Sequence, residues 1–413
     1  MKYSKYSSIS ASNFAVFIIS AFMTVSCLAI VGPETQFALN AVLAAIGCCC
    51  IYGSGVKVRA IHLTVIMLPI LLILLTSISI VMDLERSIIE DYFEIIKYIG
   101  ISLFLIIGLN VKIEVSGKKL HASVLVFSIL IALFGLGVIL FPKYFILIEG
   151  FYSRQRFFGK PITFFHTTYF AAAIYALLAS YWIFSVRPSD ARSMILSAFF
   201  SIVFLVLIVF TQSRSAVFGA AILSLIFLVR IWCFNRWPTK VVLVVSLAVA
   251  IGVIWQYSDY ASQRLGYLIS GFRSYVLNWH RNIGRDNSLG LRFAQIEWAL
   301  NNNPYLLWGA GVGKGYYRLL ESWPALYYYR FGLIGMFAYV VFWSFPIARS
   351  IQLYVRGYRS ASPLFWAIPA FIVTLPFLSL SSVMTDQPHM SAIFYGLLGV
   401  YYSNFIIRDL TNG

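Results

Sequence analysis

Charged residues are scarce in this sequence, and their scarcity excludes an ordinary water-soluble fold. Asp, Glu, Lys and Arg make up 11% of the 413 residues, whereas apolar residues make up 60% and the mean hydropathy is +0.83. A soluble domain is typically about a quarter charged and about half apolar. So few charges cannot cover a surface that faces water, but a surface that faces lipid does not need them. The composition therefore predicts an integral membrane protein.

Cysteine motifs, linkers, repeats and metal-ligand clusters are also missing. The five cysteines include no pair with CxxC spacing, so the sequence supports neither a disulfide framework nor a zinc site. Low-complexity linkers and internal repeats are absent, and the apolar segments run almost from end to end. No external group of Asp and His has the pattern of a divalent-metal site. We therefore expect residues 1–413 to form a single transmembrane domain without a cofactor or a metal.

The apolar segments predict an all-α polytopic protein with about twelve membrane-spanning helices. A spanning helix needs about 20 apolar residues. Only Thr211, Gln212 and Ser213 interrupt the apolar run before Arg214. Because residues 193–233 are about two membrane crossings long, we expect a tight hairpin there. The candidate spans are residues 13–31, 36–53, 60–82, 93–110, 121–141, 164–185, 193–210, 214–233, 240–257, 324–347, 363–383 and 388–407.

The placement of basic residues orients these spans. Cytoplasmic loops of membrane proteins carry an excess of Lys and Arg. With the N-terminus inside, the inside loops are basic, as at Lys57 and Arg59, and most of them are short. The short outside loops are mostly acidic, as at Asp83 and Glu90. The pattern predicts cytoplasmic N- and C-termini. It also explains part of the net charge of +16 without nucleic-acid binding.

Two predicted external segments break this charge rule. They are a basic loop over residues 142–166 and a large loop over residues 258–321, between the ninth and tenth spans. Arg outnumbers Lys in them, and guanidinium groups suit bidentate phosphate binding. An external anionic ligand is one interpretation, and contact with anionic lipid headgroups is the other. The basic residues are Lys143, Arg154, Arg156, Lys160, Arg264, Arg273, Arg281, Arg285, Arg292, Lys314 and Arg318.

Arg214 and Arg292 stand within ordered motifs. Arg214 opens the eighth span, where Gln212 and other hydrogen-bonding side chains surround it; we favour a functional role over a snorkelling anchor. Arg292 falls in a predicted amphipathic external helix over residues 287–300, with Ser288 as the candidate N-cap. In this helix Arg292, Ile296 and Ala299 share one face, and Leu291, Gln295 and Trp298 share another. The helix is expected to break at residues 301–304.

The segment that follows offers weaker signals. Alternating glycines over residues 307–315 would let a backbone approach phosphate closely, although a flexible turn explains them equally well. Glu321 lies at the external mouth of the tenth span, where it could act as a base or pair with an arginine. The tyrosines over residues 327–329 suit either sugar stacking or an interfacial aromatic belt.

At these motifs the chain resembles the O-antigen polymerase and ligase superfamily, which consists of bacterial membrane glycosyltransferases with a GT-C type fold. The resemblance covers residues 210–335 in motif and the whole chain in architecture. Ligases of the family usually carry His-Asn where this chain has Glu321-Ser322, so the departure favours a repeat-unit polymerase. The matching features are Ser213-Arg214-Ser215-Ala216, the helix of Arg292, Asn303-Pro304 before Gly309-Ala310-Gly311, and Glu321 before Gly332 and Gly335.

The resemblance implies transfer of a glycan from undecaprenyl diphosphate to a lipid-linked acceptor, outside the bacterial inner membrane. Arg214 and Arg292 would stabilise the diphosphate, and Glu321 would receive the proton of the acceptor hydroxyl. Membrane lipids and a chain-length regulator are further expected partners. A ligase acting on lipid A-core and a flippase of lipid-linked glycans stay open as alternatives. Further expected binding residues are Arg154, Arg156, Lys160, Gln212, Arg264, Tyr317 and Arg330.

Overall fold

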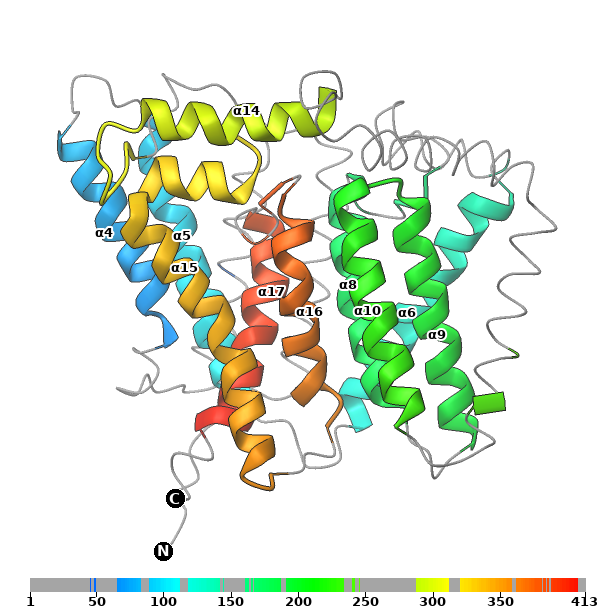
Figure 1. The fold of residues 1–413 in the computed structure, drawn as a ribbon. Helices are drawn as coiled ribbons and strands as arrows, with labels where there is room; N and C mark the ends of the chain where they lie inside the picture. The colour runs from blue at the N-terminus through cyan, green and yellow to red at the C-terminus, as the bar shows by residue number, and fades with distance from the viewer. Residues whose placement is uncertain are drawn as a thin grey trace, which may run out of the picture. The chain divides into compact units, whose positions relative to one another are not determined.

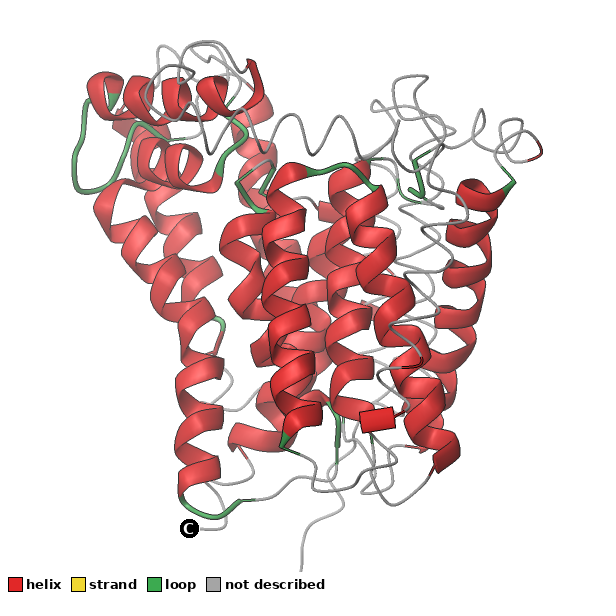
Figure 2. Ribbon diagram, turned by 45° about the vertical axis from the view of Figure 1, so that its right-hand side comes forward, coloured by secondary structure: helices red, strands yellow, loops and turns green. Residues whose placement is uncertain are grey.

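The computed structural model describes ten stretches of the chain and a few isolated residues between them. Within these stretches the secondary structure is helical (Figure 2). The predicted spans over 13–31, 36–53 and 240–257 lie almost wholly outside the described residues. The described stretches are 65–82, 89–111, 118–141, 160–162, 167–186, 191–233, 287–311, 320–358, 362–380 and 388–407.

The described helices fall on the remaining nine predicted spans, with α14 as an addition (Figure 1). In the described part of the chain, five helices are long and apolar enough to cross a membrane: α6, α8, α9, α10 and α15. This is the architecture expected of a polytopic membrane protein. The helices are α4 (Met67–Met82), α5 (Ile89–Leu109), α6 (Lys118–Leu140), α8 (Thr168–Ser185), α9 (Ala191–Phe210), α10 (Arg214–Trp232), α14 (Asn287–Asn302), α15 (Trp323–Val355), α16 (Leu364–Leu378) and α17 (Pro388–Tyr401), which continues as the π-helix η5 (Tyr402–Ile407).

The chain divides into two compact units. Unit 1 comprises residues 1–124, 295–356 and 383–413, and unit 2 comprises residues 125–294 and 357–382. The division crosses two helices, α6 between Val124 and Leu125 and α14 between Ala294 and Gln295.

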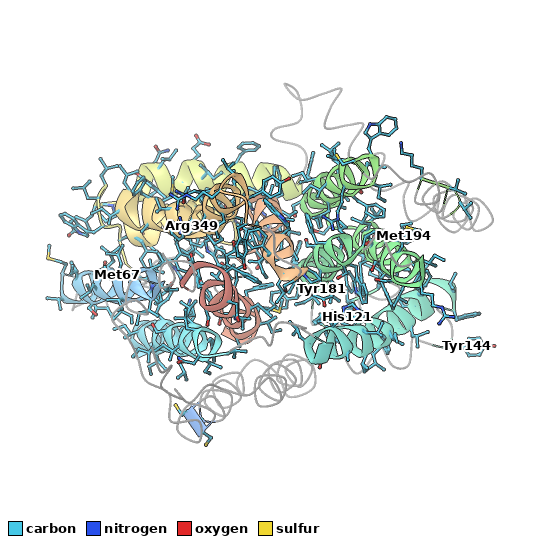
Figure 3. The ribbon with its side chains drawn as sticks, turned by 90° about the horizontal axis from the view of Figure 1, so that it is seen from below. Met67, His121, Tyr144, Tyr181, Met194 and Arg349 are labelled. Atoms are coloured by element: carbon cyan, nitrogen blue, oxygen red, sulfur yellow. The ribbon has the colours of Figure 1, made fainter. Side chains whose placement is uncertain are left out.

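Unit 2 is built around α8. Of the five candidate spans, α8 has the largest buried share, 89%, and it packs against α9, α10 and α16. Small residues such as Ala172, Ala176 and Ala179 are fully buried, which lets neighbouring helix backbones approach closely. Figure 3 labels Tyr181 of α8 and Met194 of α9, which are both buried in this unit.

The tight hairpin predicted between α9 and α10 is present. Residues 211–213 connect the two helices, and Gln212 has a left-handed backbone with φ +58°. The Thr211 hydroxyl donates to the Ile208 carbonyl over 2.6 Å, and the Ser213 amide donates to the Thr211 oxygen over 3.4 Å. The turn therefore hydrogen-bonds these polar groups within itself, as backbone groups in apolar surroundings require.

Arg230 links α10 to α8 at the end of these helices that lies away from the 211–213 turn. Its Nη2 donates to the carbonyls of Phe184 and Val186, both over 3.3 Å, and its guanidinium lies 4.8 Å from the Phe184 ring centroid. These carbonyls belong to the C-terminal end of α8, where the helix leaves its last carbonyls unbonded and carries partial negative charge. Arg230 therefore caps α8 from α10.

Unit 1 depends on close helix packing at glycines. The helix α5 packs on α17 and α4, and α4 packs on α15. A Cβ added at Gly108 of α5 would lie 2.9 Å from the Cα of Gly399 in α17, and one added at Gly399 would lie 2.5 Å from the Leu105 oxygen. Only residues without a side chain permit this crossing. Beyond the C-terminal end of α5, the Nδ2 of Asn404 in η5 donates to the Val111 carbonyl over 3.0 Å.

The long helix α15 is broken at Gly332, where φ is +61° and ψ is −161°. Residues 323–331 run roughly parallel to α14, and the chain then turns down into residues 333–355 (Figure 1). The predicted span over 324–347 falls within α15, whereas the break inside it was not predicted. Residues 333–355 extend about 34 Å at 1.5 Å per residue, which is long enough to cross a hydrocarbon core of about 30 Å.

Residues 303–311, a loop that precedes α15 in unit 1, form hydrogen bonds with the backbone groups that the break leaves without helical partners. The amides of Ala310 and Gly311 donate to the carbonyls of Tyr329 and Arg330 over 2.7 Å and 3.0 Å. In return, the amides of Leu333 and Ile334 donate to the carbonyls of Leu306 and Leu307, both over 3.0 Å. Asn303 Nδ2 adds a bond of 2.9 Å to the Tyr328 carbonyl. An unbonded peptide group away from water costs several kcal/mol, so this exchange makes the break possible.

We predict that Gly332→Ala strongly destabilises the protein. The φ/ψ pair of Gly332 is essentially restricted to glycine and costs other residues about 1–3 kcal/mol, and an added Cβ would collide with the Leu307 carbonyl. The measurement is the Tm of the detergent-purified protein. Gly357→Ala is the matched control, because φ there is +88° but a Cβ would meet nothing within 4 Å. Equal losses of Tm in both variants would show that contact with the loop does not require glycine at 332.

Candidate functional site

The predicted helix around Arg292 is present as α14. It begins at Asn287, so Ser288 lies inside its first turn and is not its N-cap, and it ends at Asn302, as expected. Gln295 and Ala299 are buried and Arg292 is half-buried, whereas Leu291 is exposed. The grouping of Arg292, Ile296 and Ala299 on one face is therefore confirmed. Leu291, Gln295 and Trp298 also share a face by their helical spacing, but they differ in exposure, because Gln295 is buried and Leu291 is exposed.

Gln295 joins α14 to the start of α15. Its side-chain oxygen accepts hydrogen bonds from the backbone amides of Glu321, over 3.1 Å, and Ser322, over 3.2 Å. Ser322 is the N-cap residue of α15, and its own side chain makes no capping bond. Gln295 therefore supplies the acceptor that an N-cap side chain usually provides. The bond fixes the backbone of Glu321, which is half-buried.

No pattern in the sequence indicates this role for Gln295. Arg292 lies one helical turn earlier on the same face of α14, and that spacing was visible in the sequence. The position of Gln295 on the same face as Arg292 was the only feature of the sequence that bore on its role. Which amides Gln295 contacts depends on the fold of residues 303–322, which no local sequence pattern predicts.

The glycine motif serves packing in the part that the structure describes. Gly309 and Gly311 have φ values of +79° and +78°. The amide of Gly309 donates to the Tyr305 carbonyl over 2.7 Å, and the amides of Ala310 and Gly311 donate to α15. These three amides are therefore used within the protein. Of the two interpretations that the sequence left open for these glycines, the structure favours a turn over an approach to phosphate for residues 309–311. Gly313 and Gly315 lie outside the described residues.

The tyrosines of α15 point into unit 1. Tyr327 is fully buried, and its ring lies 5.4 Å from Phe331 and 4.2 Å from Tyr339. Tyr329 is also buried, with its ring centroid 4.9 Å from that of Trp298. Sugar stacking and an aromatic belt are therefore both wrong for these two residues. Arg330 is buried beside them in sequence, at the end of the half-helix that Gly332 terminates.

In unit 2 the hairpin turn presents polar groups next to Arg214, the first residue of α10. Thr211 and Ser213 are buried, and the hydroxyls of Ser213 and Ser215 lie 3.3 Å apart. Gln212 is half-exposed, and its left-handed backbone is unusual for a residue other than glycine. The predicted surroundings of hydrogen-bonding groups are therefore present around this turn.

Lys160 belongs to a segment packed on the beginning of α8. The Tyr175 hydroxyl donates to the Pro161 carbonyl, and Ile162 and Phe165 are buried. Because α8, α9 and α10 alternate in direction, the start of α8 and the 211–213 turn lie at the same end of unit 2. Lys160, Gln212 and Arg214 are thus carried at one end of this unit.

The predicted site residues are divided between the two units. Glu321 and Arg330 belong to unit 1, whereas Lys160, Gln212 and Arg214 belong to unit 2. Arg292 lies just before the division that crosses α14. Arg154, Arg156, Arg264 and Tyr317 lie outside the described residues.

Neither a metal site nor a related protein assigns a role to these residues. Among the described residues, no group of three or more His, Cys, Asp or Glu is placed to hold a metal ion. No protein-family model matches the chain, and no curated protein matches it.

We predict that Gln295→Leu lowers Tm, because it leaves the amides of Glu321 and Ser322 without their acceptor. A buried amide that loses its acceptor costs about 1–3 kcal/mol. Gln295→Glu keeps an acceptor oxygen at the same position and should retain most of the Tm. Gln352→Leu, on the exposed end of α15, controls for the loss of an amide side chain. A Tm for Gln295→Leu equal to that of Gln352→Leu would contradict the capping role.

We predict that Gln212→Gly leaves Tm nearly unchanged. The left-handed backbone costs a non-glycine residue about 1–2 kcal/mol, and removing that cost offsets the extra chain entropy of glycine, about 0.5–1 kcal/mol. Gln212→Val should lower Tm clearly, because a β-branched residue fits this backbone poorly. Gln212→Gly therefore removes the side chain without a net change in the backbone cost. If Gln212→Val had the same Tm as the parent protein, the strain argument would be refuted.

Proposed function

We propose that this protein is an oligosaccharide repeat-unit polymerase that uses a donor glycan on undecaprenyl diphosphate. It transfers the glycan to the terminal sugar of another lipid-linked repeat unit on the external face of the bacterial inner membrane. Twelve spans, a GT-C type arrangement and cytoplasmic termini are part of this proposal. The described helices, which fall on nine of the twelve predicted spans, support it.

The observation that carries the proposal is the attachment of α14 to the residue pair Glu321-Ser322. The helix that bears Arg292 holds the backbone of Glu321 through Gln295. A carboxylate that is to accept a proton needs a fixed position. Gln295 thereby fixes the backbone that carries the Glu321 carboxylate at the point where residues 323–331 begin.

Glu321 acts on the acceptor in this mechanism. A hydroxyl oxygen of the acceptor sugar bonds to the anomeric carbon of the donor, and its proton passes to the Glu321 carboxylate. The bond between the anomeric carbon and the diphosphate oxygen breaks, and undecaprenyl diphosphate leaves with the electron pair. A single direct displacement of this kind inverts the anomeric configuration.

The arginines act on the leaving group. Negative charge grows on the diphosphate oxygens as the bond breaks, and guanidinium groups held in place stabilise it. We assign this role to Arg292 and Arg214, with Lys160, Gln212 and Arg330 as described candidates for contacts with glycan or phosphate. Arg154, Arg156, Arg264 and Tyr317 keep the roles that the sequence suggests for them. The mechanism as proposed uses no metal.

We predict that a strain lacking this protein shows surface polysaccharide with a single repeat unit on core and no ladder of longer chains. The measurement is gel electrophoresis of the polysaccharide from the deletion strain complemented with each variant. Glu321→Gln should fail to restore the ladder because its amide cannot accept the proton. Arg292→Lys should restore it only weakly because it loses the bidentate fork.

Two variants serve as matched controls in the same strain. Glu297→Gln changes an exposed carboxylate of α14, and Arg356→Lys changes an exposed arginine at the end of α15; both should restore the full ladder. Bare core with nothing attached in the deletion strain would instead indicate a ligase or a flippase. An unchanged ladder would exclude O-antigen as the product and direct the same test to capsule.

A further inference from the structure

The loop that bonds the break in α15 carries an exposed apolar tip between two aromatic residues. The tip is the sequence Tyr305-Leu306-Leu307-Trp308. Leu306 is 56% exposed and Leu307 is 50% exposed. The rings of Tyr305 and Trp308 are stacked at 5.5 Å, and both side chains are half-buried. Two adjacent exposed leucines are costly in water, so this tip needs an apolar environment.

The backbone of the tip is fixed to the first residues of the spanning part of α15. Leu306 and Leu307 accept hydrogen bonds from the amides of Leu333 and Ile334, both over 3.0 Å. The tip therefore lies level with the first turn of residues 333–355. Leu333 and Ile334 are themselves exposed, and Phe337, one turn further on, is 72% exposed.

The exposed apolar face continues along the spanning helix beyond Phe337. Val340, Val341 and Phe345 are exposed on α15, which is long and apolar enough to cross a membrane. A face of this kind on a spanning helix contacts lipid. The tip is continuous with that face, and this continuity identifies what covers it.

We propose that residues 305–308 insert into the bilayer at the boundary between hydrocarbon and headgroups. Residues 333–355 extend about 34 Å, slightly more than a hydrocarbon core of about 30 Å, so the level of Leu333 is this boundary. The leucines contact acyl chains there. Tyr305 and Trp308 flank them as aromatic residues commonly do at this depth.

The contact with α15 bonds four peptide groups of the loop, the carbonyls of Leu306 and Leu307 and the amides of Ala310 and Gly311. Irregular backbone at membrane depth requires partners for its amides and carbonyls. The exchange at the break provides them for these four groups, and water at the headgroup boundary reaches the other amides of the tip. The anchor fixes the height of residues 323–331, and of Glu321 before them, relative to the bilayer. The proposal concerns lipid contact alone and stands independently of the proposed chemistry.

The test is the accessibility of spin labels in the full-length protein reconstituted into phosphatidylcholine vesicles. The five native cysteines are replaced by serine, and single cysteines are introduced as Leu306→Cys and Leu307→Cys. Phe337→Cys is the lipid-facing control, and Glu297→Cys, on the exposed face of α14, is the aqueous control. Collision with oxygen reports on lipid, and collision with a water-soluble nickel chelate reports on water.

We expect labels at 306 and 307 to show a high ratio of oxygen to nickel accessibility, similar to the label at 337. A ratio similar to that at 297 would place the tip in water and overturn the proposal. Low accessibility to both reagents would mean that protein covers the tip, either a second copy of this chain or another segment, and would also overturn it. If the labels at 306 and 307 give the same result, a local disturbance of the loop by one of the labels is not its cause.

Discussion

The backbone groups on both sides of the break in α15 must be hydrogen-bonded, and the structure around the break depends on this requirement. A continuous helix would satisfy these groups itself, whereas a break at Gly332 leaves carbonyls on one side and amides on the other. Residues 303–311 bond to both sides. The loop can do so only if Gly309 and Gly311 adopt left-handed conformations. The turn of the chain from residues 323–331 into the spanning helix therefore depends on a segment that precedes it in sequence.

Sequence reasoning located the helices well where length and polarity decide the outcome. The hairpin at 211–213 was predicted because three polar residues interrupt an apolar run that is too long for one crossing, and α9 and α10 begin and end within two residues of the predicted bounds. The break at Gly332 was missed because residues 323–355 are apolar on both sides of it. Hydropathy records composition, but the partners of the broken backbone lie 19 to 27 residues earlier in the chain.

The same distinction applies to the candidate site. Glu321 and Arg292 are predictable as site residues because charge near an apolar boundary is conspicuous in a sequence. The role of Gln295 is not predictable, because the function of a neutral side chain depends on which amides it faces in the fold. The alternating glycines were visible, but their amides bond to α15 and to Tyr305. A motif of this composition therefore does not by itself separate a packing role from a ligand-binding role.

The three-residue connection between α9 and α10 also restricts how these helices can move relative to each other. Three extended residues reach only about 10 Å, so the end of α9 and the start of α10 cannot separate by more than that distance. The hydrogen bonds of Thr211 and Ser213 within the turn shorten the reach further. The two helices therefore behave as one rigid antiparallel pair, and a displacement of either helix along its axis carries the other with it.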